Sequence, residues 1–337
     1  MAGVICKFCA SEILAPSLSD ITFSNKRYSV FFCNKCKIGM TDPEPNNSQL
    51  SKLYEVGKYR EKKGRRFVPF IEYFIIAFRH SRRRRIEFFK KNGRILDIGC
   101  GRGLFLHIMK QHGWDVSAVE FDKPTATNVS ETFGINCISG HPDLWTFTAA
   151  SFDVITLNHV LEHVPWPLEM LNKCNSLLKS GGLIVISVPN FSSIQASYAK
   201  ENWFHLDIPY HLSHFTGDGL IRVIEQHGFK IVKVRRFDLE YSPFGWLQSL
   251  LNSAGVRKNL LYSYILDMEW SKRLIKDVSK FYVLIIIFLF IFFAPISLIL
   301  SLYESYVKKR GGVTEVFALK KDTLSDIVGT DDNTKII

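Results

Sequence analysis

Short apolar runs alternate with helical segments through the middle of the chain. The run Ile95–Ile98 contains one acid and leads into a loop with glycine at every second position. Leu104–Met109 follows this loop and has the pattern of a helix start. Further runs with the pattern of strands lie at 115–120, 136–140, 152–157, 183–188 and 229–237. Strands that alternate with helices in this way predict an α/β fold.

The glycine loop carries the most specific pattern in the chain. Glycine at 99, 101 and 103 allows positive φ and lets a ligand lie against the backbone, while the next helix offers free N–H groups. A dinucleotide fingerprint needs another glycine three residues after Gly101, where this chain has Leu104. The pattern Asp-x-Gly-x-Gly-x-Gly, which starts at Asp97, instead resembles motif I of the class I S-adenosylmethionine (SAM) methyltransferases. A purely structural turn is the alternative.

This resemblance implies a Rossmann-like, seven-stranded sheet with helices on both faces, and SAM as the cofactor. The acid that ends the second strand, Glu120, would hold the ribose. The strand at 152–157 resembles motif II, so Asn158 and His159 at its end would lie near the methionine part of SAM. Asp143 is the loosest match, near the adenine. The residues expected at the cofactor are Asp97, Gly99, Cys100, Gly101, Gly103, Glu120, Asp143, Asn158 and His159.

His159, Glu162 and His163 follow motif II at helical spacing. Two histidines four residues apart on one helix face can share a metal. Some RNA-end and quinone methyltransferases look similar, but they have Glu where this chain has His159. The alternative is that Glu162 and His163 cap the chain and pack locally.

A second polar cluster follows the fifth strand, where residues 203–214 contain three histidines, a Trp, an Asp and a Tyr. It resembles the Pro-x-His-Leu-x-His-Phe loop of class I methyltransferases that are often linked to modification of surface glycans and related small molecules. A hydroxyl acceptor loses its proton during methylation, and a neutral His is a suitable base. We expect His211 to be this base, ahead of His205 and His214, with His159 as a further candidate. Capping of the helix at 216–228 is the alternative for His214.

Four of the seven cysteines form two C-x-x-C pairs, Cys6 with Cys9 and Cys33 with Cys36. This spacing resembles a zinc ribbon and implies a structural zinc that the module needs for folding. A redox pair is the alternative. Some sugar C-methyltransferases look similar, with a small Cys-zinc module before the SAM domain. We see no secretory signal at the N-terminus, and reduced cysteines point to the cytosolic side.

The net charge of +11 is a local feature, because residues 58–94 carry 14 Lys and Arg against three Glu. Within this segment, aromatic and aliphatic residues recur at helical spacing from Phe67 to Phe78. Such a helix suits an anionic bilayer surface. It could equally pack its aromatic face on the methyltransferase core. Nucleic-acid binding is a less favoured third hypothesis.

An insertion separates the sixth strand from the expected last strand at 313–319, which is antiparallel in this family. It contains 23 uncharged residues, Phe281–Tyr303, which is long enough to cross a bilayer. If the last strand joins the sheet, both ends of the apolar segment lie on one side. We therefore expect a re-entrant or in-plane helical hairpin on the cytoplasmic face of a membrane. A true span and a helix buried in a soluble dimer are the alternatives.

Together these patterns predict a methyltransferase that acts on a small-molecule, glycan or lipid-linked acceptor, by in-line transfer to an oxygen. An RNA methyltransferase and a non-catalytic membrane scaffold are the other classes. The predicted organisation is a zinc-ribbon-like module at 1–45, a basic amphipathic helical segment at 46–93, the SAM-binding domain at 94–237 plus 312–321, the insertion at 238–311 and a disordered tail at 322–337.

Overall fold

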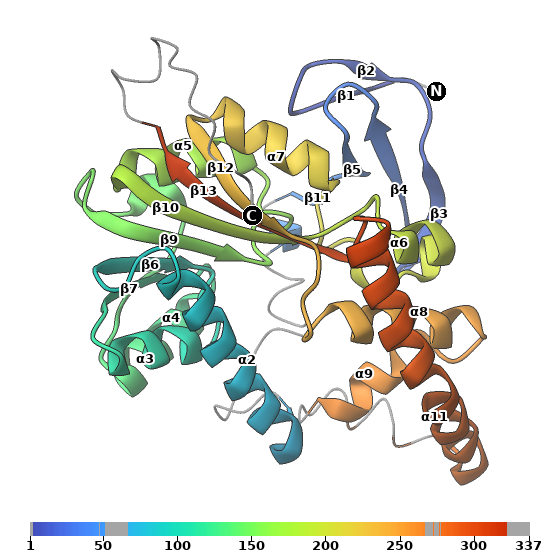
Figure 1. Cartoon of the computed structure of the whole chain (residues 1–337). Helices are drawn as coiled ribbons and strands as arrows, with labels where there is room; N and C mark the ends of the chain where they lie inside the picture. The colour runs from blue at the N-terminus through green and yellow to red at the C-terminus, as the bar shows by residue number, and fades with distance from the viewer. Residues whose placement is uncertain are drawn as a thin grey trace.

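The computed structural model describes residues 3–46, 48–50, 67–266, 272, 276 and 278–321. Its centre is a seven-stranded sheet in the order β12-β13-β10-β9-β6-β7-β8 (Figure 1). Strand β13 is antiparallel to its neighbours β10 and β12, and the other pairs are parallel. The strands are β6 (Arg94–Ile98), β7 (Asp115–Val119), β8 (Asn136–Ile138), β9 (Phe152–Asn158), β10 (Leu178–Pro189), β12 (Phe229–Arg235) and β13 (Val313–Lys320). The predicted α/β fold with seven strands is confirmed.

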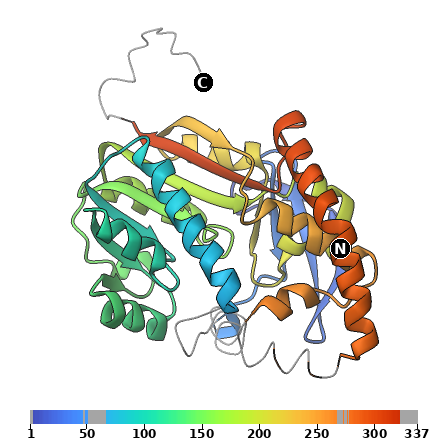
Figure 2. The same cartoon turned by 60° about the horizontal axis from the view of Figure 1, so that its bottom comes forward.

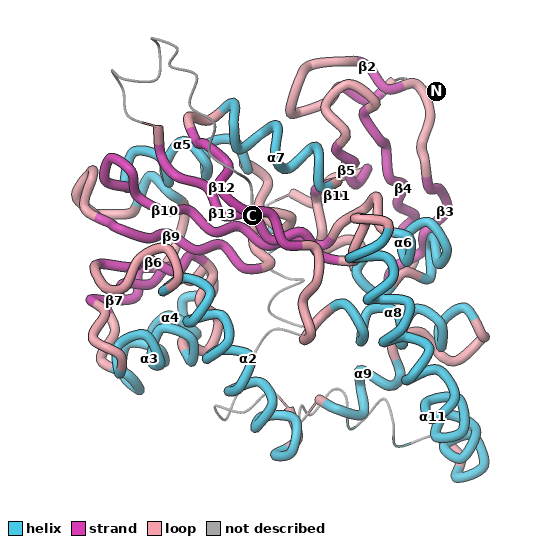
Figure 3. The backbone as a smooth tube through the Cα atoms, viewed as in Figure 1, coloured by secondary structure: helices cyan, strands magenta, loops and turns pink. Residues whose placement is uncertain are grey.

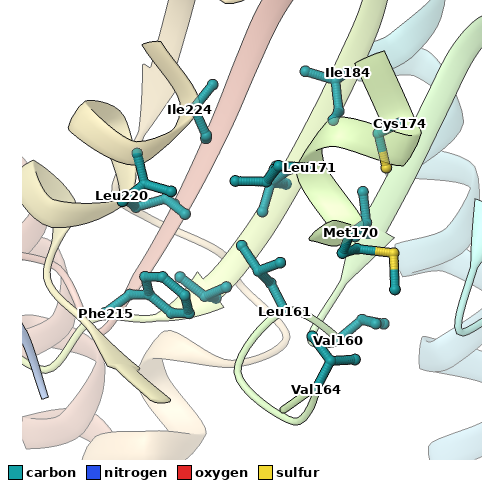
Figure 4. Close-up of a cluster of buried hydrophobic side chains, with 14 of the residues drawn as sticks. Val160, Leu161, Val164, Met170, Leu171, Cys174, Ile184, Phe215, Leu220 and Ile224 are labelled. Carbon is teal, nitrogen blue, oxygen red and sulfur yellow. The ribbon is translucent and has the colours of Figure 1, made fainter. Parts of the chain in front are cut away.

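Helices cover both faces of this sheet, as Figure 3 shows in cyan against magenta strands. They are α2 (Pro69–Glu87), α3 (Leu104–Gln111) and α4 (Lys123–Phe133) on one face, and α5 (Pro167–Leu177) and α7 (Gly217–Gln226) on the other. In β10, Leu183 packs toward the first group and its neighbour Ile184 toward the second. Figure 4 shows Ile184 in this second cluster together with Leu171 and Leu220. Burial on both faces explains the unbroken apolar runs of the strands.

The N-terminal cysteine module shares a sheet with the histidine-rich loop. Its strands are β1 (Val4–Ile5), β2 (Glu12–Ile13), β3 (Leu18–Phe23), β4 (Lys26–Cys33) and β5 (Ile38–Asp42). The last three form a sheet in the order β11-β5-β4-β3, in which β11 (Ser213–Phe215) comes from the histidine-rich loop. Ser213 pairs with Met40 and Phe215 with Ile38. Residues about 170 positions apart in the chain are therefore held together by a backbone ladder and a common core.

Helix α2 turns arginines inward and several aromatic side chains outward, the reverse of an aromatic face packed on the core. Phe70 and Phe74 are 71% and 41% exposed, whereas Arg82 is buried. Arg79 donates two hydrogen bonds to the Glu240 carboxylate, at 2.7 and 3.0 Å. Buried carboxylates need a charged partner, which explains why the cationic face points inward.

The insertion is helical, with α8 (Ser242–Ser253), α9 (Leu260–Ile265) and α11 (Lys280–Leu302), followed by a π-helical turn, η4 (Tyr303–Val307). Short helical turns α6 (Ile194–Ala199), η1 (Pro142–Leu144), η2 (Lys200–Asn202) and η3 (Phe204–Leu206) complete the described elements. The apolar segment forms one continuous helix, so the expected hairpin is wrong. Pro295 lies inside this helix and does not end it. In Figure 2 the helix runs along the side of the molecule.

Two predicted features lie outside the described residues. One is the first part of the basic segment, at 51–66, and the other is the tail at 322–337. The expectations for both therefore stay predictions.

The ion pair between Arg79 and Glu240 should stabilise the fold more than any exposed charge on the same helix. Arg79→Ala leaves the Glu240 carboxylate partly buried with its main partner removed, so we expect the free energy of unfolding to fall by about 3 kcal/mol. Arg84 lies on the same helix with an exposed side chain, and Arg84→Ala should change stability by less than about 0.5 kcal/mol. Urea unfolding measures both. If both variants lowered the free energy of unfolding equally, the result would contradict the proposed stabilisation by the Arg79–Glu240 ion pair.

Candidate functional site

The glycine loop lies between β6 and α3 in a left-handed conformation. Gly99 and Gly101 have φ of +71° and +53°. A Cβ at Gly99 would lie 2.3 Å from the Val160 side chain, so glycine is needed there for packing. A Cβ at Gly101 would have no atom within 4 Å among the described residues, so this backbone borders open space. The same loop ends at Gly103, which precedes the free N–H groups of α3.

Glu120 follows β7 and supports this loop. Its Oε2 atom accepts a hydrogen bond from the Gly101 N–H at 2.8 Å, and its Oε1 atom accepts one from the Phe121 N–H at 2.8 Å. Burial raises the pKa of this carboxyl, and these backbone bonds partly oppose the rise. The carboxylate thus connects the end of β7 to the glycine loop.

Asp97 lies in β6 and is buried. Burial raises the pKa of its carboxyl to about 6, although a 2.5 Å hydrogen bond from the Thr156 hydroxyl and the charges of Arg82 and Arg79 lower it. Thr156 comes from the neighbouring strand β9, and the two arginines come from α2. These three residues were not among the site residues predicted from the sequence, because no local pattern indicates that α2 covers this end of the sheet.

Asn158 at the end of β9 is the best test of whether the site fits SAM. The amide lies near Asp97 and weakly lowers its pKa, but neither amide atom has a partner at hydrogen-bond geometry in the described part of the chain. A buried amide normally has partners. Together, the free amide, the buried acid and the open space at Gly101 fit the polar amino-acid end of SAM.

Two other expected cofactor residues are placed differently. Cys100 is half-buried, with its sulfur 3.9 Å from the sulfur of Cys137 in β8. Asp143 lies in η1 with its carboxylate 88% exposed, where it contacts His141 at 3.1 Å. The structure thus places Cys100 in a half-buried position beside Cys137 and the Asp143 carboxylate at the surface.

His211 and His163 lie side by side, with ring centroids 4.5 Å apart. The Nδ1 atom of His211 is 2.9 Å from the carbonyl oxygen of His205, and that of His163 is 3.0 Å from the carbonyl oxygen of Tyr210. A carbonyl only accepts, so the Nδ1 of each ring donates, and the Nε2 of a neutral His211 carries a lone pair. Burial lowers the pKa of His211 to about 4, as does the charge of His163, so the ring is neutral at pH 7.

Glu162 provides the negative charge of this group. Burial opposes its ionisation, but the hydrogen bond from His159, at 3.3 Å, and the nearby histidines lower its pKa to about 2. One possible ligand atom from each of Glu162, His163 and His211 lies within 4.8 Å of the others. This spacing suits a hydroxyl group or a cation held between them. His159 is not part of this group, and its ring instead packs 4.2 Å from that of Tyr241.

His205 and His214 are both buried, and burial lowers the pKa of each to about 3. The Nε2 atom of His214 lies 2.9 Å from the hydroxyl of Thr41 in β5. Capping of α7 falls to Thr216, whose hydroxyl accepts a hydrogen bond from Gly219 at 3.0 Å. His214 is therefore a contact between the loop and the cysteine module, and the alternative of a capping role for His214 is wrong.

The four cysteines of the N-terminal module converge as their spacing predicts. The sulfurs of Cys6 and Cys36 lie 3.5 Å apart, as do those of Cys9 and Cys33, and all four lie within 4.8 Å of one another. Sulfurs at this separation can surround one tetrahedral ion with bonds of about 2.3 Å. The residues present thus fit the predicted metal.

Residues 70–234 match the model of a protein family described as a methyltransferase domain. Together with the strand order and the glycine loop, this match assigns the domain to the class I SAM-dependent methyltransferases. The resemblance drawn from the motifs is confirmed.

Individual relatives match over a shorter region. The chain is 35% identical over 105 residues to a ubiquinone biosynthesis O-methyltransferase of Coxiella burnetii, which covers 30% of this chain and 45% of that protein. The protein of the same name from Xanthomonas campestris pv. campestris is 35% identical over 104 residues, or 29% and 43% of the two chains. The chain thus spans less than half the length of these relatives.

Solved structures align over more of the chain. A SAM-dependent methyltransferase from Archaeoglobus fulgidus aligns with a TM-score of 0.45 and 22% identity, over 72% of this chain and 93% of that chain. The 1,6-didemethyltoxoflavin-N1-methyltransferase of Burkholderia thailandensis, solved with S-adenosylhomocysteine, aligns with a TM-score of 0.48 and 13% identity, over 91% and 100% of the two chains.

A side chain at Gly101 should block SAM binding. Gly101→Ala places a methyl group in the open space beside the loop, so we expect the Kd for SAM to rise at least about tenfold, besides a stability loss of about 1 kcal/mol from the positive φ. Gly113→Ala is the matched control, because Gly113 has φ of +85° and its Cβ would also meet no described atom within 4 Å. The control should lose similar stability and keep its SAM affinity. Calorimetric titration and thermal unfolding measure the two effects, and equal loss of SAM affinity in both variants would contradict the assignment.

Proposed function

We propose that the protein is a SAM-dependent O-methyltransferase that acts on a hydroxyl of a membrane-associated small molecule, such as a lipid, a quinone or a lipid-linked glycan. The main support is the group of Glu162, His163 and His211. Glu162 and His163 follow the carboxyl end of β9, and His211 joins them from the loop before β11. Ligands of open α/β sheets bind at these carboxyl ends. The name of the relatives, ubiquinone biosynthesis O-methyltransferase, agrees with a hydroxyl acceptor.

In this proposal, one set of residues binds the cofactor and another set deprotonates the acceptor. SAM supplies, when bound, a methyl group on a positively charged sulfur. Asp97, Asn158 and Glu120, with the glycine loop, would hold it. The Nε2 atom of His211 would take the proton of the acceptor hydroxyl as the methyl group arrives. The nearby charge of Glu162, which raises the pKa of His211, would stabilise the imidazolium that forms.

The location that we propose is the cytoplasmic face of a membrane. Helix α11 continues through η4 as Lys280–Val307, which is long and apolar enough to cross a membrane by length and composition. An enzyme held at this surface would meet acceptors that partition into lipid.

Labelled methyl transfer tests this function. Membranes that contain the protein are incubated with SAM carrying a labelled methyl group and with host lysate, and the products are separated into organic, water-soluble and nucleic-acid fractions. We expect label in the organic fraction, above the background of an Asp97→Ala sample. Label in RNA would instead support an RNA methyltransferase. SAM binding without any label above background would favour the non-catalytic scaffold.

Removal of the proposed base should affect turnover and not cofactor binding. In the same assay, His211→Gln should lower kcat by about 100-fold or more, the usual contribution of a general base, with the Kd for SAM changed less than about threefold. His227→Gln is the control, because His227 lies at the end of α7, outside the group of Glu162, His163 and His211, and its Nδ1 lies 2.6 Å from the carbonyl oxygen of Val223. A His211→Gln enzyme with normal kcat would exclude this base.

We also propose that the cysteine module binds one structural zinc ion. The four sulfurs fill all positions of a tetrahedral site, so the metal would have no open position for catalysis. Its effect on the reaction would be indirect. Strand β5 pairs with β11, and the Thr41 hydroxyl donates a hydrogen bond of 2.6 Å to the carbonyl oxygen of His211. Zinc would thus help to position the histidine-rich loop.

Loss of the zinc should therefore lower kcat more than it weakens SAM binding. We expect Cys33→Ser to remove the metal, to lower kcat at least about tenfold, and to change the Kd for SAM by less than about threefold, because the Gly101 N–H of the glycine loop bonds to Glu120, which lies outside this module. Elemental analysis should find about one zinc per wild-type chain. Cys137→Ser should keep this zinc. A metal-free wild-type protein with full activity would contradict the proposal.

A further inference from the structure

Helix α11 exposes an apolar surface along its whole length. Among its residues, Phe281, Phe288, Ile291 and Ile299 have 66% to 73% of their surface exposed. Exposed apolar side chains continue into η4 as far as Val307. At 1.5 Å per residue, the 28 residues of Lys280–Val307 span about 42 Å. An exposed apolar surface of this size marks an interaction site.

The opposite side of α11 is attached to the protein from one end to the other. Near its start, the Tyr282 hydroxyl accepts a hydrogen bond of 3.0 Å from the Arg257 N–H. One turn further, Ile286 is buried in a cluster with Leu247 of α8 and Leu260 of α9. The narrow buried stripe continues along the helix through Ser297, Ser301 and Glu304.

The C-terminal end of the helix is held by a buried polar contact. In η4, the Glu304 carboxylate accepts hydrogen bonds from the Gln195 side chain at 2.8 Å and from the Gln195 N–H at 3.2 Å. Gln195 belongs to α6, and β13 enters the central sheet nine residues after Glu304. A helix that crossed the bilayer would have to carry α8 and α9 into the lipid with it. The packing therefore favours a helix that lies along one face of the membrane.

The charges around α11 fit an anionic bilayer. The sequence from residue 280 to residue 310 contains one Asp or Glu, Glu304, and this residue is buried. Lys280 is exposed at one end of the helix, and Lys308 and Lys309 are exposed at the other. Basic residues that flank an apolar surface bind the headgroups of anionic lipids while the apolar side chains enter the acyl region.

We propose that the outward face of α11 and η4 docks lengthwise into one leaflet of an anionic membrane, without crossing it. This inference specifies the membrane association proposed above and does not depend on the methyl acceptor. In this arrangement both ends of the helix stay on the side of the catalytic domain, and the buried stripe remains attached to α8. Two other arrangements would also cover this surface. It could pack against a second copy of the chain, or the helix could cross the membrane once.

Vesicle flotation of the full chain tests the proposal. Two variants replace the outward face in halves: Leu284→Gln, Phe288→Gln and Ile291→Gln in the first half, and Leu298→Gln, Ile299→Gln and Leu302→Gln in the second. A matched control replaces exposed apolar residues elsewhere: Leu14→Gln, Phe88→Gln and Leu239→Gln. The probe is a vesicle of phosphatidylcholine with phosphatidylglycerol, compared with phosphatidylcholine alone.

We expect the wild type and the control to float with the anionic vesicles, and each half-face variant to lose at least about tenfold in binding. Weaker flotation with phosphatidylcholine alone is expected from the basic ends of the helix. If only the first-half variant lost vesicle binding, lengthwise docking would be overturned, and the result would indicate that only the N-terminal end of α11 enters the membrane. A wild-type dimer that both variants dissociate, with no vesicle binding, would assign the face to a second copy.

Two further measurements separate the remaining possibilities. Trypsin added outside sealed vesicles should cleave near both Lys280 and Lys308, and protection of one end until detergent is added would indicate a crossing and overturn the proposal. SAM titration of each variant checks the fold and the proposed function independently. If a half-face variant no longer floats with vesicles but keeps its SAM affinity, the result supports the docking surface. If the wild type fails to bind SAM, the result counts against the methyltransferase function and not against the docking surface.

Discussion

Buried carboxylates and their partners organise the catalytic side of the molecule. An unpaired buried charge is costly, so each such acid determines what must lie beside it. Glu240 draws the arginines of α2 inward, which brings positive charge close to Asp97 and leaves aromatic side chains of α2 at the surface. Glu162 likewise lies among three histidines, which lower its pKa and so favour its charged form. The helix before the glycine loop and the histidine-rich loop thus take their positions from charge compensation as much as from apolar packing.

The same histidine-rich loop connects the cysteine module to the site. A short loop strand such as β11 is weak alone, and it gains a partner in β5 together with the contacts of Thr41 to His211 and His214. The module is consequently connected to the histidine-rich loop through a shared sheet and side-chain contacts. A metal held by its four cysteines would stabilise the loop from the outside.

The insertion connects β12 to the last strand of the sheet, β13. Because β13 lies between β10 and β12, the chain that leaves the edge strand β12 has to return to the position beside it. It returns through α11, whose narrow inner stripe is fastened to α8 and whose wide outer face is apolar. One helix thereby completes the fold on its inner side and presents a lipid-compatible surface on its outer side.

The local sequence determined the central features of this protein. Unbroken apolar runs, glycine at every second position after Asp97, and the paired C-x-x-C motifs are short-range patterns, so the seven-stranded fold, the cofactor loop and the cysteine cluster could be predicted from them. Only the tertiary structure decided which face of α2 points inward, that His214 meets Thr41, and that the apolar segment is one helix. The first two features depend on partners more than 100 residues away, such as Glu240 for Arg79, and no local periodicity specifies the burial and charge that such distant partners impose.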